Sequence, residues 1–85
     1  MKTKEELTCL AAELRTFLAG LPSKTKLAVA IDEFCGNIEA YPTSDGVECI
    51  YCIDELSVFA RYHKLMYYVT HDEVNGVELP IFRMF

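Results

Sequence analysis

The amino-terminal part of the chain has the hydrophobic periodicity of an amphipathic helix. Thr3 and Glu6 match a capping box, in which the hydroxyl and the carboxylate satisfy backbone donors at a helix start. Apolar side chains then recur every three or four residues until Gly20 and Pro22, which are typical of a helix end. The repeating set is Leu7, Leu10, Ala11, Leu14, Phe17, Leu18 and Leu21. We therefore expect a first helix after Thr3.

Residues 24–35 fit two different periods. A helical stripe is formed by Leu27, Ala30, Ile31 and Phe34. Every second residue of 27–31 is also apolar, which is the pattern of a half-buried strand. We favour a helix because Ala30 and Phe34 fit only the helical period, and the strand remains the alternative.

After Gly36 the pattern changes to a period of two. Residues 37–41 and 47–53 flank a loop that contains Asp45 and Gly46, a pair that supplies the positive φ angles of a hairpin turn. We expect an antiparallel hairpin in which Ala40 pairs with Tyr51. The core face would carry Ile38, Ala40, Cys49, Tyr51 and Ile53.

A short helix is expected directly after this hairpin. Asp54 is placed to cap a helix over residues 55–64, and the cations Arg61 and Lys64 lie near its carboxyl end, where the helix dipole favours them. The side chains that would face the core are Leu56, Phe59 and Ala60.

The last part of the chain predicts a second hairpin. Strands over 65–70 and 77–85 flank Asn75 and Gly76, a strong type I′ turn signal. A two-residue turn there pairs Tyr68 with Arg83, Val69 with Phe82 and Tyr67 with Met84. Pro80 marks the final strand as an edge strand or a bulged strand, because proline cannot donate to a ladder.

This hairpin is apolar on both faces. One face carries Leu65, Tyr67, Val69, Phe82 and Met84, and the other carries Met66, Tyr68, Leu79, Ile81 and Phe85, interrupted by Arg83. Helices on one side of a sheet cover only one such face, so the other face needs a different cover. We therefore predict an interaction surface made of Met66, Tyr68, Ile81, Arg83 and Phe85.

Together these elements predict one α+β domain over residues 1–85. The expected order is α-α-β-β-α-β-β, with a four-stranded, mainly antiparallel sheet and the helices packed on one face. A chain of 85 residues has a thin core, and 52% of its residues are hydrophobic. Some apolar side chains are therefore expected to lack an intramolecular partner, which favours association.

The charge excludes some partners. A formal net charge of -5, with the basic residues scattered along the chain, disfavours nucleic acid, whose binding depends on Lys and Arg.

No apolar run approaches the roughly 20 residues that span a bilayer, so we expect no membrane insertion. The amino terminus has no apolar signal region, and we expect a cytoplasmic protein with reduced thiols.

The four cysteines and two histidines raise the question of a metal site. Zinc ligands of the right types are present at Cys35, Cys49, Cys52, His63 and His71. On a strand, however, the side chains of Cys49 and Cys52 point to opposite faces. We therefore expect no metal site and no cofactor, and we interpret His63 and His71 as surface histidines without a catalytic motif around them.

The same cysteine pair carries one resemblance. Residues 49–52 (CIYC) ahead of a helix, and 79–82 (LPIF) on a later strand, resemble the active-site CxxC and the proline strand of glutaredoxin-like proteins. The resemblance covers these eight residues, and the proline that the family places between its cysteines is missing. It implies a thiol-disulfide redox protein that uses Cys49 and Cys52, although the acidic neighbours of this pair disfavour a thiolate.

These observations predict a non-catalytic interaction domain. We expect a small intracellular protein that binds a protein partner or itself, as a homodimer formed through its sheet or the edge of the sheet. The alternative is the thiol redox protein, and a small-molecule binding module is the third function considered. No catalytic residue or ligand-binding cluster is identified from the sequence for the first or third function.

Overall fold

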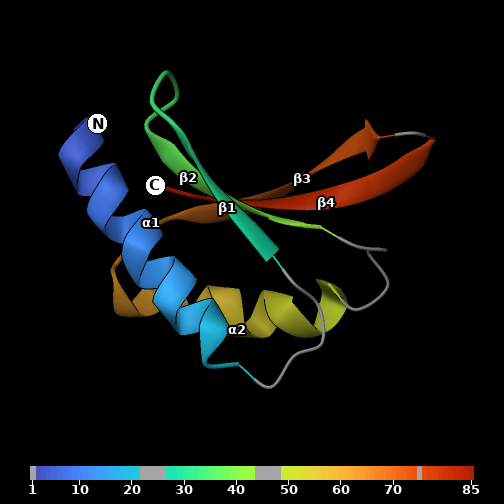
Figure 1. Cartoon of the computed structure of the whole chain (residues 1–85), viewed down its shortest axis with the longest axis horizontal. Helices are drawn as coiled ribbons and strands as arrows, with labels where there is room; N and C mark the ends of the chain where they lie inside the picture. The colour runs from blue at the N-terminus through green and yellow to red at the C-terminus, as the bar shows by residue number, and fades with distance from the viewer. Residues whose placement is uncertain (1, 22–26, 44–48, 75) are drawn as a thin grey trace.

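The computed structural model describes residues 2–21, 27–43, 49–74 and 76–85, which form two helices and a four-stranded antiparallel sheet. Along the chain the elements are α1 (Lys4–Ala19), β1 (Leu27–Asp32), β2 (Asn37–Pro42), α2 (Cys49–Tyr62), β3 (Tyr67–Val74) and β4 (Val77–Met84). Both helices lie on the same side of the sheet (Figure 1). The predicted α+β class and the antiparallel sheet are confirmed, but the order of the elements is α-β-β-α-β-β.

The sheet joins two similar units. Each helix is followed by an antiparallel hairpin, and the strand order β1-β2-β4-β3 brings the second strands of the two hairpins together. This central junction is short: β2 pairs with β4 only through Ile38–Met84, Glu39–Arg83 and Ala40–Phe82. The two hairpins diverge beyond it, as Figure 1 shows.

The capping box at the start of α1 is confirmed. The Thr3 hydroxyl accepts from the Glu6 N–H at 3.2 Å, and the Thr3 N–H donates to Glu6 Oε1 at 3.1 Å. The bond from the Thr3 backbone lowers the pKa of Glu6. From this start the apolar stripe of α1 faces the sheet, and its buried side chains are Leu7, Ala11 and Leu14.

The expected second helix is wrong, because residues 27–32 form the strand β1. All of its residues pair with β2, and the alternate side chains of Leu27, Val29 and Ile31 pack against the core. Phe34, which favoured the helix, lies in the turn between the two strands and is 93% exposed. Gly36, at φ 74°, closes this turn. Ala30 alternates with these residues and lies on the other face of β1, although its apolar side chain also fits the helical period.

The expected strand over 47–53 is also wrong, because α2 begins at Cys49. Ile38 and Ala40 pair with β1 and β4 instead of with this segment. Asp54 therefore lies inside the helix and does not cap it, while Asp45 and Gly46 lie outside the described residues. The helical spacing of the core-facing side chains explains the result: Ile53, Leu56 and Ala60 pack on one side of α2.

The second hairpin has the predicted register. Tyr67 pairs with Met84, Tyr68 with Arg83, and Val69 with Phe82. The pairing of Val74 with Val77 closes the hairpin over the two positions that the sequence predicted for its turn. The two faces of this hairpin are therefore divided between core and open side as expected.

The prediction that the final strand is an edge strand or a bulged strand is wrong, because β4 lies between β2 and β3 and pairs with β3 in an unbroken register. Met66 and Phe85 exchange two backbone hydrogen bonds of 2.9 and 3.0 Å. Alternate residues of β4, Pro80 included, therefore direct their backbone groups toward β2. Ile38 pairs with Met84 and Ala40 with Phe82, so the next hydrogen-bonded pair of β2 and β4 would be Pro42 with Pro80. Neither residue has an N–H, so the ladder ends before them.

The core lies between the helices and one face of the sheet. Its buried apolar residues are Leu7, Ala11, Leu14, Ile38, Ala40, Leu56, Phe59, Ala60, Leu65, Phe82 and Met84. The predicted inward positions of β2 and α2 are confirmed in this set. The core thus takes side chains from both helix–hairpin units, which the junction of β2 with β4 holds together.

Replacing Thr3 by Ala is expected to destabilise the fold by about 1 kcal/mol. The Glu6 N–H loses the hydroxyl that accepts its hydrogen bond, and the Glu6 carboxylate is no longer held in position for the backbone N–H of residue 3. The free energy of unfolding in urea measures this loss. Thr8→Ala is the matched control, since the Thr8 hydroxyl donates to the carbonyl of Lys4 within the helix and caps nothing. Equal losses in the two variants would contradict a capping role for Thr3.

Candidate functional site

The five residues predicted as an interaction surface lie together on the open face of the sheet. Tyr68 and Arg83 are paired, Met66 and Phe85 are joined by their backbone hydrogen bonds, and Ile81 is on the same face of β4 as Arg83. No described residue of either helix covers this side of the sheet (Figure 1). The structure thus brings all five side chains to one surface, here called the open face.

The open face exposes large apolar side chains. Met66 is 66% exposed, and Tyr68 and Phe85 are each 44% exposed. The rings of Tyr68 and Phe85 meet edge to face with their centroids 5.9 Å apart. These residue types are enriched at protein interfaces. The arrangement can supply a compact apolar contact at the end of the sheet where β3 begins.

A charged pair occupies the middle of the open face. Arg83 Nη1 donates to Glu39 Oε1, and Arg83 Nε donates to the Thr70 hydroxyl at 3.0 Å. Both charged side chains are largely buried by their neighbours. Arg83 and Glu39 are a paired residue step of the β2–β4 junction, so their ion pair ties the two helix–hairpin units on the side opposite the core.

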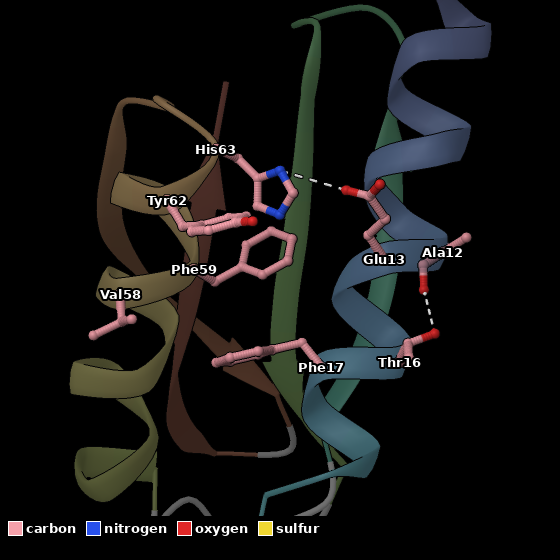
Figure 2. Close-up of a pocket in the computed structure, with 8 residues that line it drawn as sticks. All are labelled: Ala12, Glu13, Thr16, Phe17, Val58, Phe59, Tyr62 and His63. Carbon is pink, nitrogen blue, oxygen red and sulfur yellow. Dashed lines mark hydrogen bonds and ion pairs between the residues drawn. The ribbon is translucent and has the colours of Figure 1, made fainter.

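A second candidate surface lies between the two helices. Here a groove of about 670 Å³ is lined by Ala12, Glu13, Thr16, Phe17, Val58, Phe59, Tyr62 and His63. Figure 2 shows the side chain of Phe17 extending from α1 toward α2, below the ring of Phe59. The centroids of these two rings are 5.3 Å apart. The groove is therefore aromatic at its base and open at its mouth.

His63 stands at one end of the groove, directly after α2. The helix ends through Lys64, whose φ of 57° is left-handed, and through the Leu65 N–H, which donates to the Ala60 carbonyl at 2.7 Å. The imidazole packs against Phe59 at a tilt of 40° with a centroid separation of 4.3 Å, and Nδ1 lies 3.4 Å from Glu13 Oε2. His63 is thus half-buried rather than a surface histidine, whereas His71 is exposed as expected.

Sequence reasoning missed the groove because it depends on how the two helices dock. Phe17 and Phe59 were placed in the apolar stripes of their helices, with no indication that a hollow would remain between them. Glu13 falls outside the apolar stripe of its helix. The one available signal was the pair Tyr62 and His63, which follows the apolar stripe of α2 and puts polar atoms beside it.

The cysteines do not form a described thiol site. Cys9 and Cys35 are free and exposed. Asp32 Oδ1 accepts from the Cys35 N–H at 3.1 Å, which lowers the pKa of Asp32, and the hydrogen bond with Asp32 raises the pKa of the Cys35 thiol. A raised pKa makes Cys35 a poor nucleophile at neutral pH.

The CxxC segment has a different backbone from the one expected. It is helical, so the strand geometry that separated Cys49 from Cys52 no longer applies. The side chains of these two cysteines lie outside the described part of the structure. Within the part that is described, no group of three or more His, Cys, Asp or Glu side chains is placed to hold a metal ion.

Comparisons of the chain with protein-family models, with curated proteins and with solved structures found no match. Neither described helix is long and apolar enough to cross a membrane. Function is therefore inferred from the geometry and chemistry of the open face and of the groove.

Replacing Arg83 by Met is expected to destabilise the fold by about 1–3 kcal/mol, because the largely buried carboxylate of Glu39 loses its cation. The double variant Glu39→Met with Arg83→Met removes both charges, and we expect it to recover most of that stability. Urea unfolding of the single and double variants measures the coupling. If the double variant lost as much unfolding free energy as the two single variants together, a direct role for the ion pair would be contradicted.

Proposed function

We propose that the protein is a small intracellular, non-catalytic interaction module that forms a homodimer through the open face of its sheet. The observation that carries this proposal is the exposure of Met66, Tyr68 and Phe85 on a sheet face that no described helix covers. Burying such side chains is worth about 25 cal/mol for each Å² of apolar surface. A second copy supplies an apolar face of the same kind.

The charged pair at the centre of the open face supports self-association. Glu39 and Arg83 lie side by side, so a two-fold axis through them brings Glu39 of one copy near Arg83 of its partner and the reverse. Each copy of the same chain then offers a positive charge opposite the negative charge of its partner. This matters because two copies with a net charge of -5 each repel one another elsewhere on their surfaces.

The geometry of a dimer follows from ordinary sheet packing. Two sheets stack face to face at about 10 Å, with the side chains of both inner faces between them. Within the described residues, the helices α1 and α2 pack on one side of this sheet and leave the other side without a helical cover. Dimerisation gives the other side an equivalent cover and makes a sandwich with helices on the outside.

Light scattering and sedimentation on the purified chain test this proposal. We expect a dimer mass at millimolar concentration and a dissociation constant about tenfold or more weaker in Tyr68→Glu, because the substitution places a charge in the apolar part of the interface. Tyr62→Glu is the matched control. It changes an aromatic residue that is 82% exposed but belongs to α2, on the opposite side of the sheet.

Three outcomes would contradict the dimer through the open face. These are a monomer mass in the wild type at millimolar concentration, a dimer that survives Tyr68→Glu unchanged, and a dimer that Tyr62→Glu disrupts to the same extent. In the last case the helical side of the molecule would be the interface.

The second candidate is the thiol-disulfide redox protein that uses Cys49 and Cys52. The backbone at the start of α2 is helical, and a helix suits a redox pair of cysteines better than the strand expected from the sequence. Residues three apart in a helix are neighbours on its surface, and their Cα atoms lie within the range that a disulfide spans. A redox pair in this position would work independently of the open face.

Disulfide reductase activity measured with a dithiol reductant distinguishes this candidate. If it is correct, Cys49→Ser and Cys52→Ser each abolish turnover of a disulfide-bonded protein substrate, because each cysteine is needed to form and resolve the mixed disulfide. Cys9→Ser, which changes an exposed thiol on α1, is the control and should leave the rate unchanged. A wild type without activity would exclude this function.

A further inference from the structure

We propose that the groove between α1 and α2 binds a small organic cation with an apolar body, such as an arylalkyl amine. This inference goes beyond self-association, because the groove lies on the helical side of the sheet and the open face on the other. Either proposal can fail without the other.

The size and lining of the groove suit a small molecule. Its volume of about 670 Å³ lies within the roughly 300–1,000 Å³ that is usual for ligand sites. Phe17 and Phe59 form an aromatic base, and Tyr62 stands at the mouth with most of its ring exposed. A ligand with an aromatic or aliphatic body can therefore remove from water apolar surface that the fold itself leaves uncovered.

The polar atoms of the groove define the charge of the ligand. In the carboxylate of Glu13 both oxygens are acceptors. Oε2 of that carboxylate lies 3.4 Å from His63 Nδ1, and the Glu13 side chain is 58% exposed. Figure 2 shows the other ring nitrogen of His63 directed toward the ring of Phe59. The carboxylate therefore calls for a ligand that donates hydrogen bonds.

The rings around these acceptors favour a positive charge on the donor. The rings of Phe59 and Tyr62 both contact the imidazole of His63, with centroid separations of 4.3 and 5.1 Å. Aromatic faces attract an ammonium group through their quadrupole, and the attraction is larger where the site is partly dry. The net charge of -5 also draws cations toward the molecule at low ionic strength. An anion would meet Glu13 and gain nothing from the rings.

A matched series of three compounds tests the assignment on the full chain. The probes are 3,3-diphenylpropylamine, 3,3-diphenylpropanol and 3,3-diphenylpropionate, which share one apolar body and differ in charge. Binding is followed by the chemical shifts of α1 and α2 in nuclear magnetic resonance titrations. We expect the amine to bind with a dissociation constant on the order of 0.1–1 mM, the alcohol more weakly, and the carboxylate most weakly.

Two variants connect binding to the groove. Glu13→Gln is expected to weaken binding of the amine by about two- to fivefold and to leave binding of the alcohol unchanged, because only the amine is attracted by the charge of Glu13. Glu5→Gln is its matched control, with the same change of net charge in the first turn of α1 and outside the groove. Ala12→Phe fills the groove and is expected to abolish binding of both compounds, while a dispersed spectrum shows that the variant is folded.

Several results would overturn the proposal. Equal affinity for all three probes, or tighter binding of the carboxylate, would contradict the cation. Shifts confined to the open face, or no saturable shift up to the solubility limit, would contradict the site. Shifts of the groove signals on dilution without any probe would assign the groove to a second copy of the chain. That outcome would also separate the groove from the dimer interface on the open face, since Tyr68→Glu would not affect it.

Discussion

The pairing of β2 with β4 is the constraint on which the rest of the structure depends. It consists of three residue pairs, and it joins two helix–hairpin units that are otherwise held together by their buried side chains. On one side of the sheet, Ile38, Ala40, Phe82 and Met84 of this junction meet the helices. On the other side, Glu39 and Arg83 form the ion pair at the centre of the open face.

Both candidate sites follow from this arrangement. Because both helices pack on one side of the junction, they lie near each other and leave a groove between them, while no described helix covers the opposite side of the sheet. The aromatic residues divide in the same way: Phe17 and Phe59 belong to the groove, and Tyr68 and Phe85 to the open face. A thin core in a small domain explains why apolar surface remains on both sides.

Local signals in the sequence predicted those parts of the fold that depend on neighbours along the chain. The capping box of Thr3 and Glu6 and the register of the second hairpin are of this kind, and so is the composition of the open face, since the hairpin alternates around a known turn. Residues 27–32 could not be decided locally, because an alternating strand with small outward residues also fits a helix. The strand predicted from Cys49 to Ile53 was wrong for the same reason, since apolar residues at most of its positions satisfy either the helical or the strand period.

The ion pair and the groove were beyond sequence reasoning for a different reason. Glu39 and Arg83 are 44 residues apart, and the groove combines α1 with the end of α2. Such contacts depend on how complete elements dock, and no local pattern encodes that. Sequence alternation did place both charged residues on outward faces of their strands, which is the part of their geometry that a single strand determines.

The short junction has a consequence for the order in which the chain folds. Each hairpin closes a short loop, whereas the step between Glu39 and Arg83 closes one of 44 residues, and the entropic cost of closure rises with loop length. Pro42 and Pro80 prevent the late step from being extended by further backbone hydrogen bonds. We therefore expect the two helix–hairpin units to gain structure first, and the junction between them to be the slow event that completes the sheet.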